Sequence, residues 1–172
     1  MNTKNNSRRR ASVEKIEKAF AQLLQDRELK DITVTDICAM TGMNRSTFYA
    51  NFMDIYDLAD KIRDKLETEF AEVFRAEGNY HESGSALKMF THIKENQLFY
   101  STYFKLGYDE SHQVLVYDIV RAEQDFDNKH IDYHIEFFRS GINAIIKMWL
   151  RNGCVESPEE MAEIIETEYK GR

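Results

Sequence analysis

Apolar residues recur at helical spacing along most of the chain. Near the N-terminus, Ile16, Phe20, Leu23 and Leu24 belong to a row with steps of three and four, which predicts a helix over about residues 9–25. Further rows run through about residues 55–76 and 130–152. Because only one proline and seven glycines interrupt 172 residues, the pattern predicts an all-α protein.

Two short helices are expected directly after the first. Thr33 and Asp36 have the spacing of a capping box, which predicts a helix from there to about Met40. Gly42 follows where a helix C-terminus needs a left-handed residue. Asn44 is a suitable N-cap for a third helix, over about residues 45–51. The sequence therefore predicts two helices joined by a tight glycine turn.

The rest of the chain predicts further helices. Asp54 is expected to cap the long fourth helix, and Ser157, followed by Pro158, the last one, which ends near Tyr169. Loops are expected at two glycine-containing stretches, 77–84 and 107–110. Additional helices are expected over about residues 85–96, 97–106 and 111–126. We divide the chain into a three-helix head, residues 1–53, and a helical body, residues 54–172.

The segment 130–152 carries two neighbouring apolar rows. A helix that is apolar on two rows needs two partners, and one of them can be its symmetry mate. The central core helix of a monomer would show the same pattern. The second row consists of Phe137, Gly141, Ala144 and Met148. We assign the following residues of this segment to a dimer interface: Ile131, Ile135, Phe138, Gly141, Ile142, Ile145 and Trp149.

Composition and charge limit the class of protein. Cys38 and Cys154 are single and distant, which fits a reducing cytosol. No apolar run reaches the ~20 residues of a membrane span, and no signal peptide is visible. The net charge is −7, yet residues 1–50 hold nine basic and six acidic residues. A basic head on an acidic body can approach phosphate with one end, although chance unevenness would look the same.

The second helix of a helix-turn-helix enters the major groove and presents its first residues to the bases. Arg45, Ser46 and Thr47 occupy that position, and Arg can hold guanine by two hydrogen bonds. Tyr49, Asn44 and the helix start at Thr33 can contact phosphate. The basic run Arg8, Arg9 and Arg10 adds charge contacts. An ordinary helical hairpin with a glycine turn remains an alternative at this point.

The sequence from Ile32 to Phe52 resembles the DNA-binding segment of TetR-family transcriptional regulators. The match covers roughly 50 residues. The matching positions, in the order and spacing of the family, are Ile32, Thr33, Ile37, Gly42, Ser46, Thr47, Phe48, Tyr49 and Phe52. The C-terminal part is similar to the short C-terminal domain of the DhaS-like subgroup in two stretches, His92–Asn96 and Trp149–Gly153 followed by Ser157–Glu160.

The resemblance implies a homodimeric repressor that binds a palindromic operator in double-stranded DNA. It also implies that the last two helices form a four-helix bundle at the dimer interface, which adds Met161, Ile164 and Ile165 to that interface. A further implication is a small-molecule effector that releases the DNA. One departure is that Ile55 stands where the family often has a phosphate-binding Lys. The aromatic residues assigned to an effector pocket are Phe90, Phe99, Tyr103, Phe104, Tyr108 and Tyr117, which an aromatic core would explain equally well.

The sequence is also compatible with functions other than DNA binding. A co-regulator or activator that binds a partner protein through its acidic body is the main alternative. His130 and His134, four residues apart, could bind a metal from one helix face. No third ligand accompanies them, so a solvated or interface pair is the better interpretation. We find no phosphate loop, His-Glu-x-x-His site or nucleophile with a base, so the sequence predicts neither an enzyme nor a cofactor.

Overall fold

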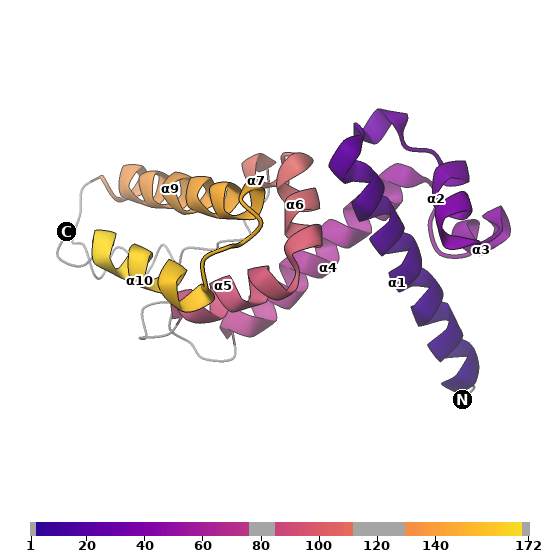
Figure 1. Cartoon of the computed structure of the whole chain (residues 1–172), viewed down its shortest axis with the longest axis horizontal. Helices are drawn as coiled ribbons and strands as arrows, with labels where there is room; N and C mark the ends of the chain where they lie inside the picture. Colours follow the sequence, from indigo (N-terminus) through magenta and orange to yellow (C-terminus); the bar gives the residue numbers. More distant parts are fainter. Residues whose placement is uncertain (1–2, 76–84, 112–129, 170–172) are drawn as a thin grey trace. The chain divides into compact units, whose positions relative to one another are not determined.

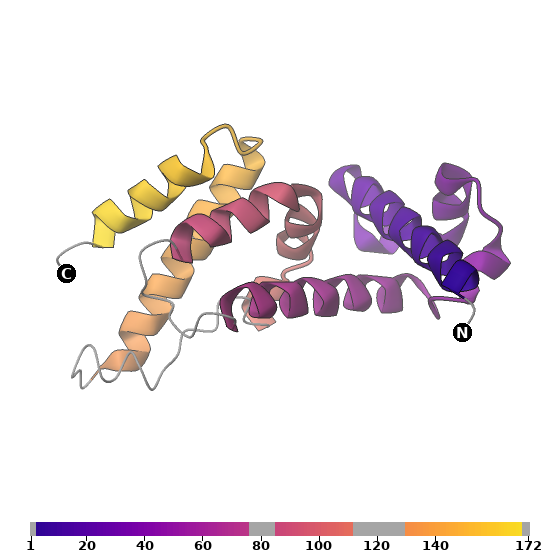
Figure 2. The ribbon, with the colours of Figure 1, turned by 90° about the horizontal axis from the view of Figure 1, so that it is seen from below.

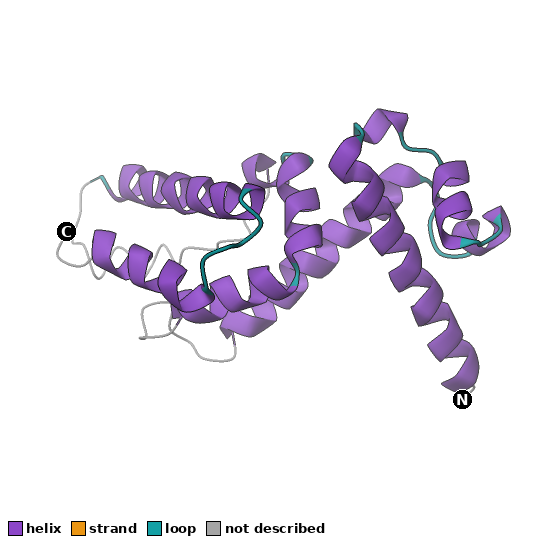
Figure 3. Ribbon diagram, in the orientation of Figure 1, coloured by secondary structure: helices purple, strands orange, loops and turns teal. Residues whose placement is uncertain are grey.

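The computed structural model describes residues 3–75, 85–111 and 130–169. These residues form helices and loops, with no strand among them, as Figure 3 shows. The predicted all-α fold is therefore confirmed. The chain divides into two compact units, Met1–Leu66 and Glu67–Arg172.

The first unit contains three helices and the start of a fourth. The elements are α1 (Thr3–Asp26), the 3-10 turn η1 (Leu29–Asp31), α2 (Val34–Thr41), α3 (Arg45–Tyr49) and α4 (Ile55–Arg75), whose residues up to Leu66 belong to this unit. The helix α1 begins earlier than its apolar row predicts. Its N-terminal turns are polar and project beyond α2 and α3 (Figure 1), so they form helix without contributing to the core.

One apolar core holds the first unit together. Phe20 of α1, Ile37 of α2 and Phe48 of α3 are fully buried, and the Phe48 ring lies 5.5 Å from that of Phe52. In α4, Leu58 is fully buried. The remaining buried apolar residues of this unit are Ile16, Ala19, Ala21, Leu24, Ile32, Ile55, Ala59, Ile62 and Leu66. Because α4 supplies part of this core, the unit extends beyond the expected head of residues 1–53.

A buried ion pair also joins α1 to α4. Glu17 is buried, and its Oε2 lies 2.9 Å from Nζ of Lys65. A carboxylate removed from water needs such a partner, because an unpaired buried charge is costly. Lys65 itself remains partly exposed, so the ion pair lies at the boundary between the core and the solvent.

The second unit continues α4 from Glu67 and adds five helices among the described residues. These are α5 (Ser85–Glu95), α6 (Gln97–Lys105), α7 (Tyr108–Ser111), α9 (Ile131–Arg151) and α10 (Pro158–Tyr169). The helix α5 packs against α10, and α6 packs against α7 and α9 (Figure 2). The expected loop at residues 107–110 was wrong, because Tyr108–Ser111 form a helical turn. The helix expected over 111–126 lies almost wholly outside the described residues.

The core of the second unit centres on Trp149. Its ring meets that of Phe90 edge to face at 5.4 Å, and its Nε1 donates to the backbone oxygen of Glu156, 3.3 Å away. Nζ of Lys94 donates to the same oxygen at 3.1 Å. These contacts hold the turn between α9 and α10 against α5. Gly153 begins that turn in the left-handed conformation, with φ of 77°, which a glycine adopts without strain.

Candidate nucleic-acid interface

Asn44 builds the N-terminus of α3. Its Oδ1 accepts hydrogen bonds from the backbone N–H of Thr47 at 2.9 Å, from the Ser46 hydroxyl at 2.6 Å and from the Thr47 hydroxyl at 2.9 Å. The predicted N-cap is therefore confirmed. Since α3 has five residues and so short a helix is marginal by itself, this cap helps to fix the start of α3.

The start of α2 is fixed by a capping box. Thr33 Oγ1 accepts from the Asp36 N–H at 3.2 Å, and the Thr33 N–H donates to Asp36 Oδ2 at 2.9 Å. Hydrogen bonds from the Thr33 hydroxyl and amide, assisted by Arg27, lower the pKa of Asp36. Gly42 ends α2 with φ of 69°, as the sequence predicts. Local signals thus set the turn that presents α3.

Two arginines, one at the start of α3 and one in α1, are held by neutral acceptors. The Nη2 of Arg45 donates to the Thr35 hydroxyl of α2 at 2.6 Å. The Nε of Arg9 in α1 donates to Asn51 Oδ1 at 2.9 Å. Within the described ranges 3–75, 85–111 and 130–169, neither guanidinium lies within ion-pair distance of a carboxylate. Both side chains are exposed, so each combines a fixed position with an uncompensated positive charge.

A groove of about 530 Å³ lies between the N-terminal part of α1 and α3. Its lining is mostly polar and basic: Arg8, Arg9, Ser12, Ser46, Thr47, Ala50 and Asn51. Of the basic run, Arg10 is exposed and does not line this groove. The arrangement brings together guanidinium groups and hydroxyls, which are the donors that bind phosphate oxygens.

The comparisons with known proteins fit this geometry. Residues 81–170, slightly more than half of the chain, match a TetR-type family described as "Transcriptional regulator C-terminal region". The chain belongs to the TetR family of transcriptional regulators. This family is one of regulators and not of enzymes.

Two relatives of this TetR-family chain carry related names. The HTH-type dhaKLM operon transcriptional activator DhaS of Lactococcus lactis subsp. lactis (strain IL1403) is 30% identical over 122 residues, which are 69% of this chain and 64% of that protein. The chain therefore spans less than two thirds of that relative's length. The solved structure of a dihydroxyacetone kinase operon activator DhaS has a TM-score of 0.58 at 24% identity, covering 91% of this chain and 92% of the other. It shows the same fold.

Most residues predicted to touch DNA gather at one end of the first unit. Arg45, Ser46 and Tyr49 are exposed, while Thr47 is half-buried and Phe48 is core, as predicted. Ile55, the position of the expected Lys, is buried. A lysine that contacts this region is Lys61, whose Nζ donates to the Asn51 carbonyl at 3.0 Å and pairs with Asp57 at 2.8 Å.

Sequence analysis missed Asn51, Thr35 and Ser12. Arg9 and Asn51 are 42 positions apart, and Arg45 and Thr35 are ten apart. Neither separation corresponds to neighbours on one helix face, where contacts occur at three and four. The only signal was that these residue types can hydrogen-bond, which is too common to identify a site.

The residues assigned to dimerisation divide into three groups by exposure. The residues buried within the chain are Ile131, Ile142, Trp149, Met161 and Ile165. The half-buried residues are Ile135, Phe138, Gly141 and Ile145. Ile164 is exposed. The exposed side of α9 instead carries Tyr133 (78% exposed), Phe137 (68%) and Met148 (52%). Phe137 and Met148 belong to the second apolar row, with Gly141 and the exposed Ala144 between them.

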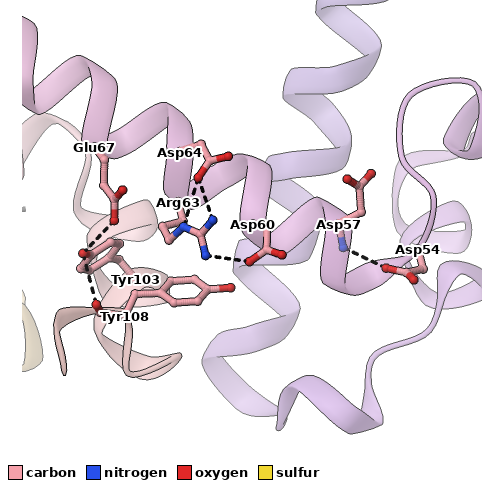
Figure 4. A network of polar contacts seen from close by, with 8 residues as sticks. All are labelled: Asp54, Asp57, Asp60, Arg63, Asp64, Glu67, Tyr103 and Tyr108. Carbon is pink, nitrogen blue, oxygen red and sulfur yellow. Dashed lines mark hydrogen bonds and ion pairs between the residues drawn. The ribbon is translucent and has the colours of Figure 1, made fainter. Parts of the chain in front are cut away.

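The aromatic residues assigned to an effector pocket lie mainly in packed positions. Phe90 and Tyr103 are buried, and the Tyr103 hydroxyl lies 3.2 Å from Glu67 and 3.4 Å from the Tyr108 carbonyl (Figure 4). Phe99, Phe104 and Tyr108 are half-buried. Tyr117 lies outside the described residues.

Three buried polar atoms in this unit lack a hydrogen-bond partner among the described residues, and one of them is Asp109 Oδ1. The other two lie close together. They are Tyr100 Oη and His92 Nε2, and their rings meet edge to face at 5.7 Å. Burial lowers the pKa of His92, an effect that Glu69 and Glu95 oppose. Burial also raises the pKa of Tyr100, so its hydroxyl stays protonated.

His130 and His134 are both exposed. In the part of the chain that the structure describes, no group of three or more His, Cys, Asp or Glu residues could hold a metal ion. Nor does any helix in that part have the length and apolarity to span a bilayer.

Proposed function

We propose that this TetR-family chain binds double-stranded DNA with α3 in the major groove. The observation that carries the proposal is the capped start of α3 beside two oriented, uncompensated arginines, Arg45 and Arg9. Arg45 has the charge and fork geometry to hold a guanine, and Ser46 lies beside it. Arg8, Arg9, Arg10, Thr33, Thr47 and Tyr49 then contact the backbone or the groove.

The proposed assembly is a homodimer formed through the exposed face of α9. A row of exposed aromatic and Met side chains on a soluble helix is costly unless another surface covers it. Gly141 and Ala144 in the middle of the row allow close approach of two helices. A symmetric pair would present two copies of α3, which a palindromic operator matches. The interface therefore consists of Tyr133, Phe137, Gly141, Ala144 and Met148, with Ile164 of α10.

The proposed direction of regulation is activation. The relative that is 30% identical is named a transcriptional activator, and we extend this to the present chain in place of the repression expected from sequence. A co-regulator that binds another protein is the second function. The same exposed face of α9 favours it, because a different protein could cover Phe137 and Met148.

We include a small-molecule effector in the proposal. An unpartnered buried polar atom costs about 1–3 kcal/mol, so a polar molecule that reached Tyr100 Oη and His92 Nε2 would gain by bonding to them. This part of the second unit also contains Phe99 and Tyr103 from the aromatic set. The ligand chemistry is that of a hydrogen-bonding molecule with an apolar part.

DNA binding is tested by fluorescence anisotropy with duplexes selected from a random pool, at about 50 mM salt, where electrostatic contacts are strong. Wild type should enrich specific duplexes, and Arg45→Ala should weaken binding to them by about 5–100-fold, as expected for a bidentate base contact. Arg151→Ala, which removes one cation from α9, is the matched control and should bind normally. No enrichment by wild type would overturn the proposal.

The assembly is tested by light scattering at several protein concentrations. Wild type should be a dimer, and Phe137→Glu should be a monomer with weaker DNA binding. Phe138→Glu is the comparison for loss of stability. It places a charge at a half-buried position, so it should lower the free energy of unfolding as well. A Phe137→Glu protein that remains a dimer would reject this interface. A wild-type monomer would favour the co-regulator.

A further inference from the structure

We infer that Asn51 is a positioning residue that orients Arg9 to bind a DNA phosphate in the groove between α1 and α3. The inference rests on the proposed function, since it assumes that α3 docks on DNA. It adds a role for Asn51, which neither touches the bases nor carries charge. It also makes the N-terminal part of α1 and the end of α3 one phosphate site.

The side chain of Asn51 is held on both sides. Its Nδ2 donates to the Thr47 carbonyl of α3 at 2.9 Å, and its Oδ1 accepts from the Nε of Arg9 at 2.9 Å. The first bond fixes the amide plane of Asn51 against α3. The second bond orients the guanidinium of Arg9 in α1. The backbone carbonyl of Asn51 also accepts from Lys61 at 3.0 Å. Asn51 is therefore a junction between α1, α3 and α4 within the first unit.

The neutrality of the acceptor is the decisive feature. Other arginines in the chain face carboxylates: Arg27 lies 3.2 Å from Asp36, and Arg63 pairs with Asp60 and Asp64 at 2.9 and 2.8 Å (Figure 4). Their charges are compensated within the protein. Arg9 receives the same kind of geometric restraint from an amide, so its full charge remains available to an external anion. An Asp at position 51 would restrain Arg9 in the same way, but its carboxylate would compensate the positive charge of Arg9.

The restraint uses one edge of the guanidinium only. Arg has five N–H donors, and the bond to Asn51 occupies the one on Nε. The Nη groups can therefore meet two phosphate oxygens side by side, which is the geometry that arginine prefers. Because a free Arg side chain loses rotamer entropy when it is fixed, holding it beforehand improves binding.

The groove supplies the other donors that a phosphate needs. Arg8 brings a second cation, and the hydroxyls of Ser12, Ser46 and Thr47 line the same space. The Arg8 guanidinium can donate hydrogen bonds to anionic oxygen directly. The three hydroxyls now donate to protein oxygens, Ser12 to the Arg8 carbonyl and Ser46 and Thr47 to Asn44 Oδ1, so they must rotate before they can donate to a phosphate. Since Ser46 and Thr47 are also at the start of α3, a phosphate here would set the register in which Arg45 meets the bases.

The test is a double-mutant cycle on DNA affinity with the full chain. The probe is a selected duplex of about 30 base pairs, long enough for two half-sites, measured by anisotropy. Asn51→Ala should weaken binding by about 3–10-fold, the worth of a net hydrogen bond. In the Arg9→Ala background the same change should weaken binding by less than about twofold, because its target is gone. Equal effects in both backgrounds would overturn the inference.

Arg10→Ala provides the matched control. It removes one cation from the same basic run without touching Asn51, so its effect and that of Asn51→Ala should be additive. Arg9→Ala should also reduce the slope of affinity against salt by about one ion, as loss of a phosphate contact does. An unchanged slope would mean that Arg9 meets no phosphate.

A second variant keeps the test valid if Asn51→Ala loses its fold, which circular dichroism would report. Arg9→Lys retains the charge, but lysine has neither the Nε edge nor the planar fork. It should lose most of the affinity that Arg9→Ala loses. If Arg9→Lys binds as wild type does, charge alone matters and orientation by Asn51 does not. If wild type itself binds no duplex, the proposed function fails before the inference is tested.

Discussion

Asn44 has two separable roles, and two substitutions distinguish them. Asn44→Ala removes the oxygen that accepts three hydrogen bonds at the start of α3. Loss of an N-cap costs about 0.5–2 kcal/mol, and α3 has only five residues to resist fraying. We expect a loss of about 1–2 kcal/mol in the free energy of unfolding. For a chain of this size that lowers Tm by about 2–8 °C.

Asn44→Asp keeps the acceptor and adds a negative charge. A carboxylate at a helix N-terminus is stabilising by about 0.3–1 kcal/mol, so this variant should be as stable as wild type or slightly more so. In the proposed complex the same charge would lie near the DNA phosphates. One unit charge at about 4 Å is worth roughly 1 kcal/mol in water, so affinity should fall by about fivefold or more.

The assays are thermal unfolding by circular dichroism and anisotropy with a selected duplex. Amide hydrogen exchange at Thr47 gives a local measurement of α3, because its N–H donates to the cap. Asn44→Ala should accelerate this exchange, and Asn44→Asp should not. Two results would refute the reasoning: an Asn44→Ala protein of wild-type stability and exchange, or an Asn44→Asp protein of wild-type affinity.

Three further predictions concern the cores of the two units. Lys65→Met should lower stability by about 1–3 kcal/mol in urea unfolding, because Glu17 then stays buried without its partner; the added change Glu17→Gln should recover part of the loss, and no recovery would contradict this account. Tyr100→Phe should keep or raise Tm, since it removes a buried hydroxyl that has no partner among the described residues; a loss above about 1 kcal/mol would indicate that the hydroxyl is bonded after all. The pKa of His92 is lowered in the fold, so near and below the ordinary value of 6.5 the unfolded chain binds more protons than the folded chain, and stability should fall as pH drops through that range. His92→Gln should flatten this pH dependence, and the exposed His134→Gln should not. Equal slopes of stability against pH for the two variants would refute the assignment of the pH dependence to His92.

Local signals predicted the helix-turn-helix well. Thr33, Asn44 and Gly42 act on backbone groups within four positions of themselves, so their roles follow from residue type and spacing. The structure shows each of them in the predicted place. The apolar rows likewise identified the helices, because the period of a helix repeats along the sequence.

Tertiary contacts could not be predicted in the same way. Two apolar rows were visible in α9, but only the structure shows that Trp149 and Ile142 face the core while Phe137 and Met148 are exposed. The same holds for Arg9 and Asn51, which come together because α1 packs beside α3. The early start of α1 escaped prediction for a different reason, since Thr3 to Arg8 form helix without an apolar face.

The most direct test of DNA recognition by α3 is site selection with wild type and Arg45→Ala in parallel. Wild type should select a palindrome, because the proposed dimer presents two copies of α3. Arg45→Ala should select the same palindrome with lost preference at one guanine in each half-site, since a single bidentate contact has been removed from each copy. Identical preferences at every position for the two proteins would contradict the claim that α3 reads the bases.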